Sequence, residues 1–148
     1  MATNISNLKS VIINRIASQV SKVGNVENYE RTGFDKFPGV TVICSGNDNK
    51  FWSTAQNERA FNFIIRIYEQ LEQKPALETV SDNAKQRAER ILEECVSQII
   101  DAFDSYIAFG GAAEYCRSSP SEWGYAFIGS GWCRTAEVKL QVIQLYTI

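Results

Sequence analysis

The chain has 148 residues, of which 45% are hydrophobic and 22% charged, which suits a single domain with an ordinary apolar core. Its net charge of −2 argues against binding along a nucleic-acid backbone or to an anionic membrane surface. The sequence contains no histidine, which excludes Ser-His-Asp triads, Cys-His dyads and histidine-ligated metal sites.

Targeting and cofactor signals are also missing. The first ten residues, MATNISNLKS, lack the basic segment and apolar run of a signal peptide, and no apolar stretch reaches the roughly 20 residues of a transmembrane helix. We therefore expect synthesis in the cytoplasm and no membrane partner. The four cysteines are scattered without a Cys-x-x-Cys pair, which favours free thiols, and we expect neither a metal nor a cofactor.

In chain order, the sequence first predicts an amphipathic helix over about 4–23, because apolar residues recur there at three- and four-residue steps. Strand-like segments follow at 26–32 and 37–45, and 46–50 has the composition of a polar turn. The strongest strand lies within 56–71, where apolar and aromatic residues alternate. Its two predicted faces are Phe61, Phe63, Ile65 and Ile67 on one side, and Asn62, Ile64, Arg66 and Tyr68 on the other.

The second half starts with a helix predicted over about 82–106, with Ser81 as its N-cap. Its apolar stripe consists of Ala84, Ala88, Ile91, Leu92, Cys95, Ile99 and Phe103. Three strands are then expected at 112–118, 122–129 and 132–148, the last two joined by a three-residue Gly-Ser-Gly hairpin loop.

The predicted element order is therefore α-β-β-β-α-β-β-β in one domain that covers residues 1–148. Strands grouped between helices indicate the α+β class, with a mostly antiparallel sheet packed on one face against two main helices. No internal repeat or low-complexity segment interrupts this order.

The aromatic residues beside the glycine loop form the first candidate site. Trp123, Tyr125 and Trp132 flank the loop, which favours either a cross-strand aromatic cluster or an interface with another chain, where tryptophan is enriched. These two interpretations are compatible. Phosphate binding by the glycines is not expected, because no Gly-Lys-Ser/Thr follows and the loop joins two strands.

Two further segments contain candidate interface residues. In the segment 51–59, a dense polar group follows two aromatic residues, which favours subunit contact over an ordinary loop or a small-molecule site. The candidates there are Phe51, Trp52, Gln56, Asn57, Glu58 and Arg59. In the last strand the second face becomes apolar at Ile143 and Leu145, so we expect the first helix or a second subunit to cover it.

Acidic residues of the second helix are a weaker candidate. Glu94, Asp101 and Asp104 could act in acid–base chemistry or bind Mg²⁺. They lie opposite the apolar stripe and alternate with arginines, so we interpret them as part of a solvated helix face.

Five segments together resemble the tail terminator, or tail completion, proteins of tailed bacteriophages. They are FPGVTV, AQNERAFNFIIRIYEQ, IIDAFDS, PSEWGY and RTAEVKLQVI, spread over roughly 26–146. The resemblance implies a structural virion protein that catalyses no reaction. Such proteins form a six-fold ring at the head-proximal end of the tail tube, where they end tube polymerisation and join the tail to the neck and head.

The same resemblance implies the partners: five further copies of the chain in a hexamer, the tail tube protein, a neck or connector protein and, in a contractile tail, the sheath. DNA passes through the lumen without specific binding, which suits a mildly acidic chain. No residue-level motif is carried over from the family. The alternatives are a neck or head-completion connector, a small ligand-binding or enzymatic α+β domain, and a dimeric interaction module.

Overall fold

The computed structural model describes residues 5–21, 23–29, 34, 36–51, 56–106, 113–129 and 131–147. Within these ranges, two helices and five strands follow one another, with a short 3-10 helix before the second helix. They are α1 (Ile5–Gln19), β1 (Asn25–Glu27), β2 (Gly39–Phe51), β3 (Gln56–Gln70), η1 (Leu77–Thr79), α2 (Asp82–Asp104), β4 (Tyr115–Ile128) and β5 (Gly131–Thr147). The strands form one sheet in the order β1-β2-β3-β5-β4.

This sheet confirms the predicted α+β class. The short β1 pairs with β2 in parallel, and all other neighbours are antiparallel. The described element order is α-β-β-β-α-β-β, one strand fewer than predicted. Separate strands were expected at 112–118 and 122–129, but the structure has one strand there, β4 (Tyr115–Ile128), whose register shifts between Pro120 and Trp123. Proline has no N–H to donate, and it is tolerated here because β4 is an edge strand with a bulge.

Two predicted turns also differ from the structure. Residues 46–50 do not form a turn but continue β2, whose pairing with β3 runs to Phe51 opposite Asn57. Gly46 lies at a register shift with a φ of 146°, so its missing Cβ lets the chain pass the irregularity and keep pairing. The hairpin between β4 and β5 has a two-residue connection, because Ile128 pairs directly with Gly131. Gly129 takes the left-handed φ of 66° that such a turn requires.

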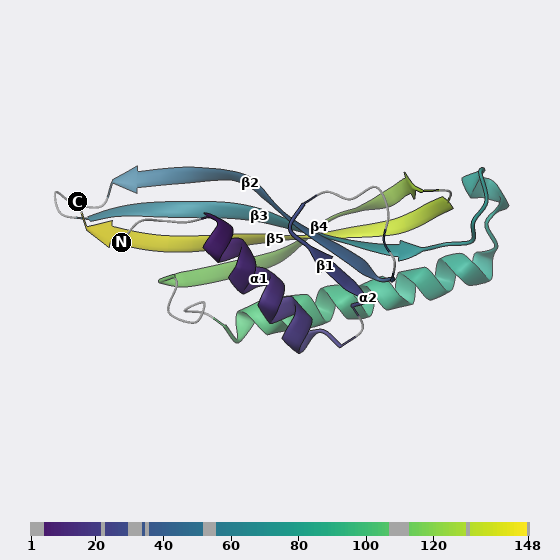
Figure 1. Cartoon of the computed structure of the whole chain (residues 1–148), viewed down its shortest axis with the longest axis horizontal. Helices are drawn as coiled ribbons and strands as arrows, with labels where there is room; N and C mark the ends of the chain where they lie inside the picture. Colours follow the sequence, from purple (N-terminus) through teal and green to yellow (C-terminus); the bar gives the residue numbers. More distant parts are fainter. Residues whose placement is uncertain are drawn as a thin grey trace.

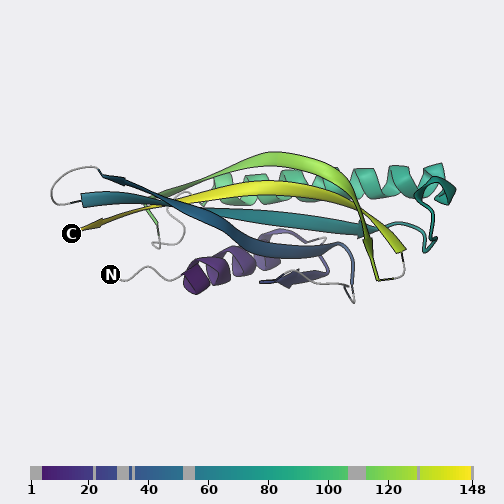
Figure 2. The same cartoon turned by 90° about the horizontal axis from the view of Figure 1, so that it is seen from above.

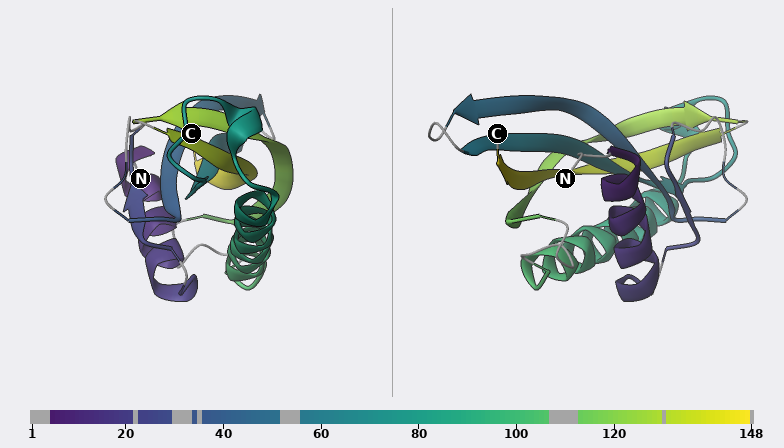
Figure 3. Two further views of the ribbon diagram at one scale, coloured as in Figure 1. Left: turned by 90° about the vertical axis from the view of Figure 1, so that its right-hand side faces the viewer. Right: turned by 60° about the vertical axis from the view of Figure 1, so that its left-hand side comes forward.

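Both helices pack on the same face of the twisted sheet, as predicted (Figures 1 and 2). α1 lies against β1 and β2, whereas α2 lies against β3, β4 and β5. The end-on view on the left of Figure 3 shows the two helices side by side beneath the sheet. The predicted inner face of β3 is confirmed, because its four apolar side chains are all buried in the main core. Each such side chain contributes roughly 1.5–3 kcal/mol when fully buried.

Polar contacts fix the ends of α2. At its start, the Ser81 side chain accepts a hydrogen bond from the Ala84 N–H, which confirms the predicted N-cap. At its end, Arg15 of α1 donates from Nε to the Ala102 carbonyl over 3.1 Å and from Nη2 to the Ser105 hydroxyl over 3.2 Å. The same guanidinium lies 4.2 Å from the centre of the Tyr106 ring. Arg15 therefore binds α1 to the C-terminal carbonyls of α2.

The four main strands are longer than the part of the sheet that the helices cover. β2, β3, β4 and β5 contain 13, 15, 14 and 17 residues, whereas about 5–6 is typical. At ~3.3 Å per residue, β5 alone spans about 55 Å. One end of β2, β3 and β5 extends well past both helices, on the left of Figure 1.

Candidate assembly surfaces

The hairpin of β4 and β5 places the predicted aromatic residues on the helix side of the sheet. Arg134 lies between two of them, with its guanidinium 5.3 Å from the centre of the Trp123 ring and 4.7 Å from that of Tyr125. Its Nε and Nη2 bind the Glu89 carboxylate of α2 at 3.0–3.1 Å, and its Nη1 donates to the Gly124 carbonyl over 2.9 Å. Arg134 thus joins the hairpin to α2, so Trp123 supports the fold of its own chain.

Trp132 is also held within the chain. Its indole Nε1–H donates to the Pro75 carbonyl over 3.1 Å, and its ring packs against the second apolar cluster of Leu71, Val80 and Ala88. Phe127 contacts the same ring edge to face, with centroids 5.5 Å apart. The cross-strand aromatic pair is therefore Phe127 with Trp132, and Trp123 belongs to a separate contact.

The aromatic surface that remains open at the hairpin belongs to Tyr125 and Phe127, which are 43% and 50% exposed. Of these, only Tyr125 was a sequence candidate. Phe127 could have been found from the same alternation, because a two-residue turn places it directly opposite Trp132. The assumed three-residue loop concealed this register.

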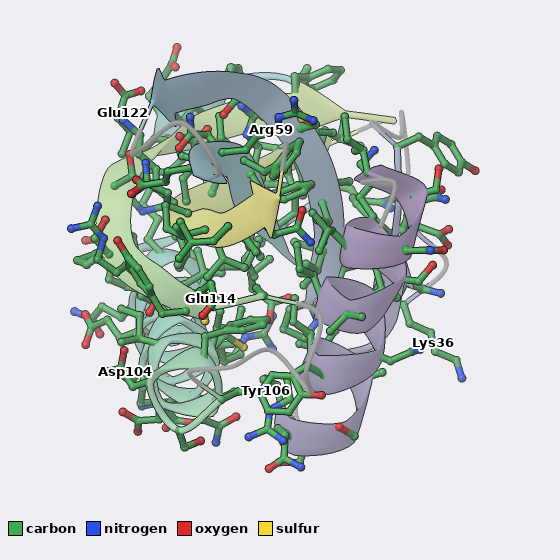
Figure 4. The ribbon with its side chains drawn as sticks, turned by 90° about the vertical axis from the view of Figure 1, so that its left-hand side faces the viewer. Lys36, Arg59, Asp104, Tyr106, Glu114 and Glu122 are labelled. Carbon is green, nitrogen blue, oxygen red and sulfur yellow. The ribbon has the colours of Figure 1, made fainter. Side chains whose placement is uncertain are left out.

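The other two candidate segments come together at the opposite end of the sheet. Glu58 pairs with Leu145, and Arg59 pairs with Gln144. Figure 4 looks onto this end, with Arg59 above the end of β5. Glu58 and Arg59 are half-buried and both make contacts within the chain. Phe51, Gln56 and Asn57 take part in the strand pairing, but their side chains, like the whole of Trp52, lie outside the described residues.

The structure corrects the expectation for Ile143, which was assigned to an interface. Ile143 is only 2% exposed in the single chain. Its cross-strand neighbours on the same sheet face are Ala60 and Tyr115. Leu145, two residues further along, is half-buried and keeps some surface for a partner.

A half-open hollow of about 540 Å³ lies on the sheet face opposite the helices. We call it the sheet hollow, and its lining is mostly polar: Ser45, Asn62, Phe63, Arg117, Ser118, Ser119, Lys139, Leu140 and Gln141. These residues come from β2, β3, β4 and β5, which meet there through the ladder rows Asn62–Gln141–Arg117 and Lys139–Ser119. The hollow was not a sequence candidate, because only the pairing register assembles it.

Burial raises the pKa of two cysteine thiols in the described core. Burial, helped by the nearby Asp104 carboxylate, raises the pKa of the Cys116 thiol to about 11. Burial and then Glu69 raise the pKa of Cys133, also to about 11. Both thiols therefore stay protonated near neutral pH and are poor nucleophiles. All four cysteines are free, as predicted.

No family model and no curated protein matches the chain. In the described ranges, no group of three or more acidic or cysteine side chains is placed to hold a metal ion. Nor do those ranges contain a helix with both the length and the apolar character that crossing a membrane requires.

Proposed function

We propose that the chain is a structural subunit of a ring at the head-proximal end of a phage tail. In this role it ends tail-tube polymerisation and joins the tail to the neck and head. Its partners are further copies of itself in a hexamer, the tube protein and a neck or connector protein, and its location is the virion.

The observation that carries this proposal is the end of β2, β3 and β5 that extends past the helices (Figure 1). A chain of 148 residues needs only short strands to enclose a core, and strands beyond the helices add ladder surface that helices do not cover. Such surface is suited to neighbours in an assembly. The half-buried Glu58, Arg59 and Leu145 lie at this end.

The resembling segments support the same proposal through their placement. They fall at the start of β2, along β3, at the end of α2, within β4 and within β5. These elements form one connected framework, since β3 pairs with β2 and β5, and α2 packs on β4 and β5. The resemblance therefore covers the parts that set the shape of the subunit.

A ring needs two different surfaces on each subunit, because a closed ring is a head-to-tail assembly. The described chain offers a sheet face with the polar residues of the hollow on one side and two helices on the other (Figure 3). These faces differ in shape and chemistry, as a head-to-tail contact requires.

The test combines solution mass with tube binding. Light scattering across concentration should detect a species near six times 16.7 kDa, either alone or once purified tail tubes are added. Electron microscopy should show the protein at one tip of each tube, and capped tubes should stop growing when tube protein is added. A protein that remains a monomer or dimer and ignores tubes would contradict the proposal.

A further inference from the structure

The sheet hollow contains two positive charges, Lys139 and Arg117, which form no ion pair with any residue that the structure describes. Lys139 is exposed and makes no hydrogen bond or ion pair with any other residue that the structure describes. Arg117 donates one Nη2 hydrogen bond to Gln141 Oε1, and Gln141 Nε2 donates to Asn62 Oδ1 over 3.1 Å. This relay crosses three strands and holds the Arg117 guanidinium over the hollow.

Two carboxylates near the hollow are already engaged. On the same sheet face, Glu137 binds Arg66 with an Nη2–Oε2 distance of 2.7 Å and a second contact to Nε. On the helix side, Asp104 accepts a hydrogen bond from Ser118 over 3.4 Å. Lys139 and Arg117 occupy diagonal positions on neighbouring strands, about 7–8 Å apart. The hollow therefore presents two cations and the hydroxyl of Ser119, which is suitable for a carboxylate, whereas the Ser45 hydroxyl already donates to the Asn62 carbonyl.

The opposite side of the molecule has the complementary charge. Glu93, Ser97 and Asp101 are exposed at four-residue steps on α2, so they form one row, which we call the acidic ridge. The last turn of α2 contains no basic residue, although cations are favoured there by the helix dipole. Arg15 is occupied by the Ala102 carbonyl, Ser105 and Tyr106. Within the described ranges, no cation pairs with Glu93 or Asp101.

We propose that the sheet hollow of one subunit receives the acidic ridge of a second copy of this chain. The inference rests on the proposed ring, and it names the two surfaces that form the ring contact. The hollow lies on the sheet face away from the helices, whereas the ridge lies on the outer side of α2. A contact between them is therefore head to tail, and it leaves a free hollow and a free ridge for the next subunits.

Two charge-reversal variants separate the two surfaces. Lys139→Glu reverses a charge in the hollow and leaves the ridge unchanged. Glu93→Lys with Asp101→Lys reverses the charge of the ridge and leaves the hollow unchanged. Matched controls change equally exposed residues elsewhere: Lys36→Glu, which lies on the α1 side in Figure 4, and Glu78→Lys in η1. Circular dichroism confirms that each variant is folded, and light scattering at low and high salt measures its association.

We expect each surface variant to self-associate at least about tenfold more weakly than the wild type, because a like charge now faces the contact. The controls should associate normally, and wild-type association should weaken as salt is raised. Mixing the two variants should restore assembly beyond what either variant reaches alone, because each intact ridge meets an intact hollow and each reversed ridge meets a reversed hollow. Combining all three changes in one chain should restore self-association through the reversed pair.

Several results would overturn the inference. They are variants that associate like the wild type, a mixture that stays monomeric, and a wild type that is monomeric at every concentration and salt both with and without tail tubes. The tube-capping experiment separates this failure from that of the proposed function. If the wild type caps tubes and the surface variants still form rings, the inference is wrong but the proposed function stands. If neither the wild type nor any variant caps tubes, the proposed function is wrong.

Discussion

The two ends of the sheet differ in how far they are attached to the helices. At the hairpin end, β4 and β5 turn tightly at Gly129 and are fastened to α2 through Arg134 and to the η1 region through Trp132. At the other end, β2, β3 and β5 continue past both helices (Figure 1). The aromatic hairpin, which the sequence marks most strongly, mainly serves folding, whereas in our proposal the less conspicuous strand ends supply the surface for assembly.

This difference follows from what each side chain contacts. A tryptophan at an interface and a tryptophan under a hairpin have the same sequence signature, because both bury a large ring with one polar atom. Only the partner of the Trp132 Nε1–H, the Pro75 carbonyl, decides between them. Substitutions at either end of the sheet test this difference between the two ends.

The largest effect is expected for Trp132→Ala. The change removes the ring from the cluster of Leu71, Val80 and Ala88 and deletes the hydrogen bond to Pro75, so the free energy of unfolding should fall by about 3 kcal/mol. Urea denaturation measures this loss. Trp132→Phe keeps most of the packing and should cost about 1 kcal/mol, mainly through the hydrogen bond. Equal stability of the alanine variant and the wild type would show that the hairpin is not fastened here.

The Arg134→Ala variant should have the next largest effect. It removes the paired contact to Glu89 and the stacking on Trp123 and Tyr125, and we expect a loss of about 2 kcal/mol because the pair is only partly shielded from water. Urea denaturation again gives the value. Arg90→Ala, an exposed change on the same helix, is the control and should stay within about 0.5 kcal/mol.

The sequence predicts this fold well wherever a residue pattern is compatible with only one secondary structure and one buried face. The period of two in β3 and the apolar stripe of α2 place their side chains correctly, because a wrong register would bury Arg66 or expose Ile65. Ser81 marks the start of α2 for a similar local reason. The turn expected at 46–50 fails because the polar composition also suits a ladder that a glycine bulge carries onward.

The candidate surfaces are less predictable. Ile143 looks like interface material in the sequence, and only the folded chain shows that it lies beside Ala60 and Tyr115 and is buried. The sheet hollow combines residues from four strands, with Ser45 and Gln141 almost a hundred positions apart. No local pattern contains such a site, because the pairing register creates it.

A smaller effect on stability, but a larger one on assembly, is expected for Leu145→Ser at the extended end. Leu145 is half-buried beside Glu58, so its replacement should cost roughly 1 kcal/mol or less. If this end meets a neighbour, ring formation or tube capping should fall at least about tenfold while the isolated chain stays folded. Parallel measurements of unfolding and of solution mass separate the two effects. A loss of stability as large as that of Trp132→Ala would contradict the assigned difference between the ends.

The smallest effect concerns Glu69, which is buried near the hairpin end. Burial raises the pKa of its carboxyl above 4.5, although the Gln70 N–H and the Arg87 charge both oppose this shift. The folded state therefore binds more protons than the unfolded state as the pH rises from about 4.5 to the raised pKa, so the Glu69 contribution to stability falls through that window. Glu69→Gln should remove this decline, because a neutral amide has no charge to desolvate and its oxygen can still accept from the Gln70 N–H. Denaturation of both proteins at pH values from below 4.5 to 7 measures the difference in stability, which should increasingly favour the glutamine variant as the pH rises. The same comparison for exposed Glu93→Gln should show no such trend, and parallel pH curves for wild type and Glu69→Gln would mean that the hairpin end gains nothing from keeping this carboxyl protonated.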